Sequence, residues 1–334
     1  MINTWALYKL LVCELIFGIC ICNAKILIIT HNYNRPDFIK IQYNTFKKFL
    51  LDEYEFVVFN DATDHALELQ INNVCSHLNI RCIRIPQENR TQPNTVIDMS
   101  KYVFWAGLRH AEAILYSLET IGFDYPGVVM MIDSDMFLTK NFSAEEYMMG
   151  YDIAGLSQVR GYARFLWAGL IFFRMDTLPN KHHMQFKGGV AGDIPYDTGG
   201  SLHYYFQDNP SVRIRYFDQD FRLFLDKDFN VYGIHNTLLT KLENPFFSPQ
   251  CSLCKSTNVC CTHPDVILSE LGIDPKIISL VKDENFIPEI ELVLKDTFVH
   301  YQAVSNYRKK AKKFHDEKTK KLNVFIKSIL GCQS

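Results

Sequence analysis

Two aspartates one residue apart, Asp133 and Asp135, close an apolar run that begins at Val128 in the stretch VVMMIDSDMF. Like charges at this spacing repel and raise each other's pKa unless a cation lies between them. A wholly apolar run predicts a buried strand, so the pair would stand where the chain leaves the sheet. We therefore expect Asp133 and Asp135 to bind a divalent metal ion, Mn²⁺ or Mg²⁺.

The elements before this motif must position it, and they alternate between apolar runs and segments with helical spacing. Continuous apolar strands that alternate with helices indicate an α/β fold with a Rossmann-like, mostly parallel central sheet flanked by helices. Strands are expected at 25–30, 54–62 and 81–85, and helices after Pro36, at 65–78 and at 103–121.

Polar residues follow several of these strands. Ligands of mostly parallel sheets bind at the carboxyl ends of the strands, so side chains there converge although they are far apart in sequence. The residues expected at this edge, besides the two aspartates, are Thr30, Asn32, Asp61 and Ser134.

The second half of the chain has a less regular rhythm. Strands are expected at 152–158, 164–173, 212–217 and 291–301, and short helices at 201–206 and 264–271. No linker or repeat interrupts the sequence, so we expect one domain from residue 25 to residue 334.

An apolar strand that ends in Asp-x-Asp has two chemical uses. In phosphatases of the haloacid dehalogenase superfamily the first Asp attacks phosphate, which would make Asp133 a nucleophile. In glycosyltransferases of the GT-A class both carboxylates hold a metal that bridges the diphosphate of a nucleotide-sugar. The dehalogenase motif belongs to the first strand of its fold, whereas about a hundred residues precede Asp133 after the leader. The position therefore favours the second use.

The order of elements from Lys25 to Tyr307 resembles a GT-A glycosyltransferase. THNYNRPDFI resembles the first strand, loop and helix of that class, and FNDA resembles its base- or ribose-contacting Asp. The resemblance implies that Asn32 and Asp61 receive the nucleoside. It also implies that Arg109, in the helix before the motif, presents its own positive charge to the nucleotide. The alternative is that Arg109 is a solvated residue of that helix.

Two later segments add to the resemblance. FLWAGLIFFRMDTLP resembles the segment after the motif, where small residues leave room for the donor sugar, which implicates Trp167 and Gly169. The alternative is a tightly packed strand. FVHYQAVSNY ends an apolar strand in His300, and retaining members of the class complete the metal shell with a C-terminal His. The Lys expected six residues later is absent, which leaves Arg308 as the nearest cation for the diphosphate.

A candidate general base is Asp197 in the stretch PYDTGG. The two glycines that follow it permit a tight backbone near an acceptor, and an inverting transfer would need such a base. The alternative is a turn or helix-capping Asp. Asp218 and Asp220 form a rival acidic pair.

These residues predict a metal-dependent glycosyltransferase of the hexosyltransferase type. It would move a sugar from a nucleotide-sugar, expected to be a UDP-sugar, to a hydroxyl of a glycan, lipid or protein acceptor. Two other hypotheses stay open: a phosphatase of the dehalogenase type with Asp133 as nucleophile, and a carbohydrate-binding GT-A relative without turnover.

The first 24 residues have the composition of a signal peptide, with one Lys, an apolar run and a cleavage site after Ala24. Glu14 interrupts that run, so an uncleaved N-terminal anchor is the alternative. Either segment predicts a location in the lumen of the secretory pathway or outside the cell. The Cys-rich stretch around 245–264 is then an insertion held by disulfides, with a zinc site as the alternative.

The charge distribution limits the partners. A formal net charge of −2 argues against a nucleic-acid partner. The segment from Arg308 to Lys327 is locally basic and predicts an amphipathic surface helix, for which peripheral contact with an anionic membrane is a secondary expectation.

Overall fold

A computed structural model of the chain describes ten stretches, and three of them, 26–88, 105–191 and 194–217, hold most of the fold. The shorter stretches are 90–92, 223–225, 231–233, 259–260, 290–294, 296–301 and 312–331. Several expected features lie outside these residues: the leader, the pair Asp218 and Asp220, the helix at 264–271, Arg308, and all of the Cys-rich stretch except Val259–Cys260. Within the described residues no helix is long and apolar enough to cross a membrane.

A seven-stranded sheet forms the centre of the molecule, in the order β10-β6-β7-β4-β1-β2-β3. β1 pairs in parallel with β2 and β4, and β7 runs antiparallel to both of its neighbours. This confirms the expected α/β fold with a mostly parallel sheet. The strands are β1 (Ile26–Asn32), β2 (Tyr54–Asn60), β3 (Arg81–Arg84), β4 (Val128–Asp133), β6 (Ile153–Arg160), β7 (Ala163–Arg174) and β10 (Ile214–Tyr216).

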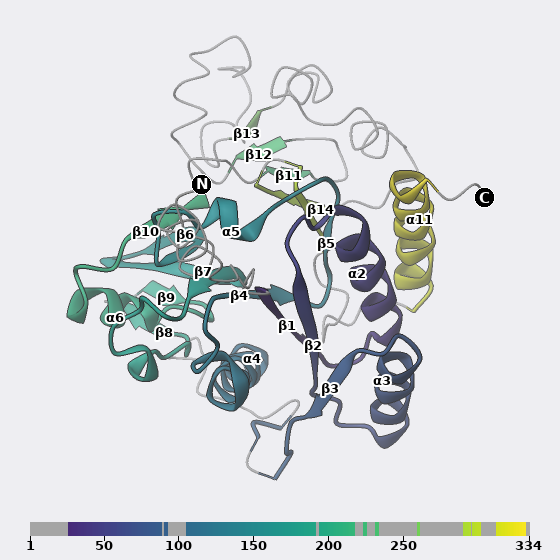
Figure 1. The fold of residues 1–334 in the computed structure, drawn as a ribbon, viewed down its shortest axis with the longest axis horizontal. Helices are drawn as coiled ribbons and strands as arrows, with labels where there is room; N and C mark the ends of the chain where they lie inside the picture. The colour runs from purple at the N-terminus through teal and green to yellow at the C-terminus, as the bar shows by residue number, and fades with distance from the viewer. Residues whose placement is uncertain are drawn as a thin grey trace, which may run out of the picture.

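Helices cover both faces of this sheet (Figure 1). Alternate residues of a strand point to opposite faces. Ile28 of β1 accordingly packs in one apolar core with Phe38, and Leu27 packs in the other with Ile114. On the first face lie α2 (Pro36–Phe49), α3 (His65–His77) and α11 (Lys312–Leu330), and on the second lie α4 (Trp105–Ser117), its π-helical extension η2 (Leu118–Gly122) and α6 (Leu202–Asp208).

A second sheet of six strands stands beside the first, in the order β13-β12-β11-β14-β15-β5, and all its pairings are antiparallel (Figure 1). Its strands are β5 (Met136–Leu138), β11 (Leu223–Leu225), β12 (Val231–Gly233), β13 (Val259–Cys260), β14 (Ile290–Val293) and β15 (Phe298–His300). The remaining elements are α5 (Ala144–Tyr147), η3 (Lys181–His183), β8 (Gly189–Ala191) and β9 (Ile194–Tyr196).

One expected strand is in fact a pair of strands. The segment 291–301 turns back at Leu294, whose φ of +50° is left-handed, so β14 and β15 form a hairpin. The apolar run that begins at Val128 ends as expected, because β4 stops at Asp133 and the chain leaves the central sheet there. The residues after Asp135 form β5, which belongs to the second sheet.

Candidate metal centre

The turn between β4 and β5 is fixed from both sides. The side-chain amide of Gln42, a buried residue of α2, donates to the carbonyl oxygens of Asp133 at 2.8 Å and Met136 at 3.1 Å. The backbone N–H of Tyr301 donates to the carbonyl oxygen of Asp135 at 2.8 Å. These bonds satisfy the carbonyl oxygens of Asp133, Asp135 and Met136. The carboxylates of the two aspartates take no part in them and project into the same space.

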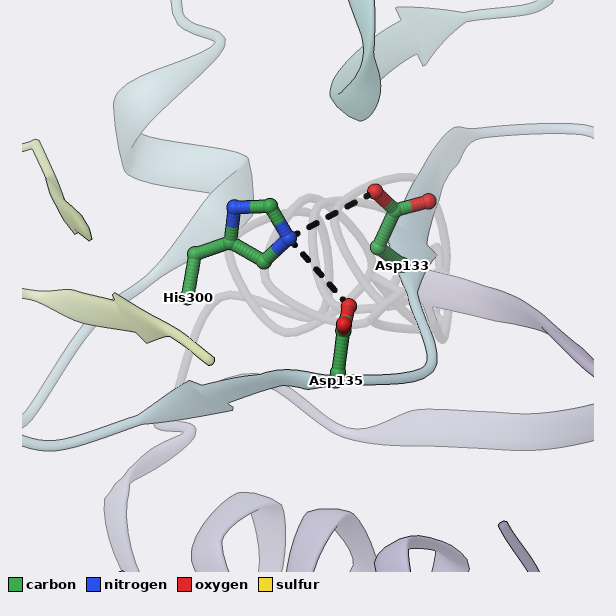
Figure 2. A group of neighbouring side chains, drawn as sticks. All are labelled: Asp133, Asp135 and His300. Atoms are coloured by element: carbon green, nitrogen blue, oxygen red, sulfur yellow. Dashed lines mark ion pairs between the residues drawn. The ribbon is translucent and has the colours of Figure 1, made fainter. Parts of the chain in front are cut away.

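His300 completes the cluster from the end of β15. Its Nε2 lies 3.2 Å from Oδ1 of Asp135 and 3.8 Å from Oδ2 of Asp133, and the three side chains point toward one another (Figure 2). One ligand atom from each residue lies within 4.8 Å of the others. Asp135 and His300 are buried and Asp133 is half-buried. The structure thus brings together the three residues that were expected to hold a metal.

The charge in this cluster fits a divalent cation. Burial raises the pKa of Asp133, and the nearby carboxylates of Asp135 and Asp197 raise it further, while His110 and His300 act in the opposite direction. Two neighbouring carboxylates thus act on Asp133 against two histidines, an arrangement in which a bound cation would stabilise the ionised form. Carboxylate oxygens and an imidazole nitrogen form a donor set that Mn²⁺ accepts while keeping open positions for further oxygen ligands.

A second histidine contacts the cluster and was not identified from the sequence. Nε2 of His110, on α4, lies 3.4 Å from Oδ1 of Asp133, the oxygen that does not face His300. The carboxylate of Asp133 is therefore held between two imidazoles. The ring of His31 meets the ring of His110 edge-on, with centroids 5.9 Å apart. The sequence signal for His110 was its place next to Arg109 in the helix before the motif.

Trp167 and Gly169 of β7 act as a unit beside His300. The indole ring of Trp167 lies 5.1 Å from the imidazole of His300, centroid to centroid. A Cβ atom at Gly169 would lie 2.1 Å from the indole, so Trp167 itself fills the room that this glycine leaves. The expectation was that the small residue makes room for a donor sugar, whereas its direct role in the structure is to let the indole lie against His300.

Asp61 and Arg109 are bonded to each other. Nη2 and Nε of Arg109 donate to the two carboxylate oxygens of Asp61 at 2.8 and 2.9 Å, and Arg90 adds a third bond at 3.1 Å. Asp61 and Arg109 are 5% and 3% exposed. The alternative of a solvated Arg109 is therefore wrong, and the charge of each residue is already matched within the fold. The ring of Tyr33 lies over the guanidinium of Arg109, 5.4 Å away.

The other residues expected at this edge have local partners or are buried. The side-chain amide of Asn32 donates to the carbonyl oxygen of Arg35 at 2.8 Å and accepts from its N–H at 3.1 Å, which shapes the entry to α2. Thr30 is fully buried in β1, and Ser134 in the turn is 7% exposed. These three residues therefore contribute to the shape of the edge.

Asp197 is exposed and lies near the cluster, since its charge acts on Asp133. Its Oδ1 accepts from the N–H of Thr198 at 2.7 Å, and the hydroxyl of Thr198 donates to the carbonyl oxygen of Gly107 at the start of α4. Gly199 has a φ of +95°, and a Cβ atom there would lie 2.2 Å from the carbonyl oxygen of Leu166. The expected tight backbone is present and holds an exposed carboxylate beside the metal centre.

Comparison with known proteins finds glycosyltransferases among solved structures, at low similarity. No family model and no curated protein matches the sequence. The mannosyltransferase PcManGT from Pyrobaculum calidifontis, in complex with GDP-Man and Mn²⁺, matches 57% of this chain and 54% of its own, with 11% identity and a TM-score of 0.37. The bifunctional glycosyltransferase WbbM, in its apo form, matches 60% of this chain and 39% of its own, with 10% identity and a TM-score of 0.36. At these TM-scores the likeness carries no argument about function.

Proposed function

We propose that this protein is a metal-dependent glycosyltransferase of the GT-A class. The observation that carries the proposal is the convergence of Asp133, Asp135 and His300 at the carboxyl edge of a mostly parallel sheet, where such folds bind their ligands. The aspartates and the histidine come from distant segments, and both segments resemble metal-binding segments of the class.

The three side chains would hold Mn²⁺, or Mg²⁺ as the alternative ion. When bound, the ion supplies Lewis-acid stabilisation of the departing nucleoside diphosphate. His110 contacts the second oxygen of Asp133, and the indole of Trp167 packs against the ring of His300. The chain's own part in this step is therefore to fix the directions of the three donor atoms.

The donor is proposed to be a UDP-sugar and the acceptor a hydroxyl of a glycan, lipid or protein. Because both carboxylate oxygens of Asp61 are bonded to arginines, the nucleoside would meet the closed pair of Asp61 and Arg109 with the ring of Tyr33 above it. Asp197 is proposed as the general base if the transfer inverts the sugar. Its exposure beside the cluster is the support for that role.

Calorimetric titration of the full chain with UDP, GDP, CDP and dTDP tests the proposal, first with Mn²⁺ and then with EDTA. We expect one diphosphate to bind only with the metal, and we expect Asp135→Asn and His300→Ala to weaken this binding by more than about 100-fold. Asp176→Asn is the matched control, since this exposed residue follows β7 at the opposite end of the sheet from Asp133.

The outcomes separate the hypotheses. If the folded protein binds no diphosphate with Mn²⁺, the transferase proposal fails, and trapping of a phospho-aspartate at Asp133 then tests the phosphatase. Sugar binding that is unchanged in Asp135→Asn, without transfer in the wild type, would identify a carbohydrate-binding relative without turnover.

A further inference from the structure

Two cysteines outside the metal centre lie against each other at the junction of α3 and β3. Cys75, in the last turn of α3, is fully buried, and Cys82, in β3, is partly exposed. The connection between them is short and tight: the N–H of Ile80 donates to the carbonyl oxygen of Cys75 at 2.8 Å, and Asn79 takes a left-handed φ of +53°. The turn therefore brings the two residues to the same place.

Contacts on the face of α3 place both sulfur atoms together. Asn72 and Cys75 are three residues apart, so their side chains lie on the same face of the helix. The thiol of Cys82 donates to Oδ1 of Asn72 at 3.3 Å, which sets Cys82 against that face. Cys82 also packs against the apolar core that contains Cys75, and each thiol shifts the pKa of the other. The turn and the bond to Asn72 therefore direct both thiols to the same site between α3 and β3.

The two thiols differ in reactivity. The hydrogen bond from Cys75 lowers the pKa of Cys82, with a further contribution from the charge of Arg84 against the opposing effect of burial. The same hydrogen bond, together with burial, raises the pKa of Cys75. A partly exposed thiol that ionises more easily is the better nucleophile. Cys82 is therefore suited to react first and Cys75 second.

We propose that Cys75 and Cys82 are a redox-active dithiol, which a disulfide-containing oxidant converts to a disulfide that links α3 to β3. The sulfur of Cys82 attacks the disulfide of the oxidant, forms a mixed disulfide and releases one thiol of the oxidant. The sulfur of Cys75 then attacks the sulfur of Cys82, which forms the internal bond and releases the second thiol. The two thiols of the protein lose two protons and two electrons in total. The oxidant gains them when its disulfide is reduced to two thiols.

Peptide mapping tests the bond, because Arg81 separates the two cysteines. Trypsin cleaves after Lys48, Arg81 and Arg84, so it places Cys75 in the fragment 49–81 and Cys82 in the fragment 82–84. The full chain is incubated with oxidised glutathione, alkylated and digested. We expect the two fragments as one species, lighter than their sum by two hydrogen atoms, which a reductant separates. Recovery of separate fragments, or of either fragment linked to another cysteine, would overturn the proposal.

Single variants test the order of the two attacks. In Cys75→Ser the mixed disulfide with glutathione should persist on Cys82, because the second thiol is missing. In Cys82→Ser the buried Cys75 should acquire glutathione at least about tenfold more slowly than Cys82 does in the first variant. Cys75→Ala replaces Cys75→Ser if the hydroxyl prevents folding. Equal rates at the two positions, or a faster adduct at Cys75, would contradict the assigned order.

Discussion

Two aspartates at the same edge of the central sheet have opposite surroundings. Asp61 follows β2 and is bonded through both carboxylate oxygens to Arg109 and Arg90. Asp133 ends β4 and faces a second carboxylate, so its pKa is raised, first by burial and then in part by Asp135. In sequence both are simply an Asp at the end of an apolar strand. The difference shows that the neighbours of a carboxylate, more than the residue type, separate a buried arginine pair from a candidate metal ligand.

The largest predicted effect concerns the buried ion pairs of Asp61 with Arg109 and Arg90. Asp61→Asn removes the carboxylate that pairs with the buried guanidinium of Arg109, while Arg90 keeps its ion pair with Glu112 at 3.0 Å, so we expect the free energy of unfolding to fall by about 3–5 kcal/mol. Urea denaturation measures this change. Asp64→Asn is the control, since this residue only caps α3 and its loss should cost about 1 kcal/mol or less. Equal losses of stability in Asp61→Asn and Asp64→Asn would contradict the prediction that the Asp61 carboxylate stabilises the fold by pairing with a buried arginine.

The next effect concerns the histidine that holds Asp133 from the side of α4. His110→Ala frees one oxygen of that carboxylate, so we expect the affinity for Mn²⁺ to fall by about 10–100-fold, as for other groups that orient a ligand. Titration with Mn²⁺ measures this affinity. His77→Ala is the matched control, because His77 is an exposed residue of α3. An unchanged affinity in His110→Ala would show that the cluster does not depend on α4.

The ion pair of Asp152 with Arg213 shows what exposure of the partner changes. Asp152 is buried, as Asp61 is, but its arginine is largely exposed. Asp152 accepts two bonds from the side chain of Arg213 and one from its backbone N–H, and these bonds lower the pKa of Asp152 to about 2. The side chain of Arg213 is 57% exposed. We therefore expect Asp152→Asn to cost at most about 1 kcal/mol at neutral pH, less than Asp61→Asn.

The pH dependence of this ion pair has a definite sign. The folded-state pKa of Asp152 is lower than the usual 3.8, so its stabilising effect is complete above about pH 4 and is lost as the pH falls through about 2. Denaturation of wild type and variant across this window should show curves that converge at the acidic end. A difference that persists to the lowest pH would mean that the carboxylate charge is not the cause.

The smallest effect has the opposite sign. Without metal, Asp133→Asn removes one of two crowded negative charges, so we expect the free energy of unfolding to stay constant or to rise by up to about 1 kcal/mol. With Mn²⁺ the wild type should gain stability and the variant should not, because only the folded wild type binds the ion tightly. Thermal denaturation with Mn²⁺ and with EDTA measures both. A clear loss of stability of Asp133→Asn in EDTA would show that the carboxylate of Asp133, like that of Asp61, stabilises the fold without a metal.

The strand and helix order was predictable because local periodicity determines it. The residues of runs such as 54–62 and 65–78 show by their own spacing whether a strand or a helix forms. The expected helices that fall on described residues lie near their expected bounds. The second sheet was not predictable, since β5 is only three residues long and pairs with β15 from the other end of the chain. Its formation depends on a partner strand that no local pattern can identify.

The metal centre shows the same limit at the level of single residues. Asp133 and Asp135 could be named because they close an apolar run, and His300 because its place at the end of a strand resembles the C-terminal His of the GT-A class. The contact of His110 with Asp133, and the bond between Asp61 and Arg109, depend on the angle at which α4 crosses the sheet. That angle is set by packing against β1 and β4, so the sequence pattern suggested each residue's importance but not its partner.

The pairing of β5 with β15 also bears on how the protein is made. The two aspartates leave the ribosome long before His300 does, and a contact between segments so far apart has a large loop-closure entropy. A growing chain can therefore assemble much of the central sheet while the candidate metal centre still lacks the imidazole. The cluster of Asp133, Asp135 and His300 is complete only in molecules whose translation has passed His300.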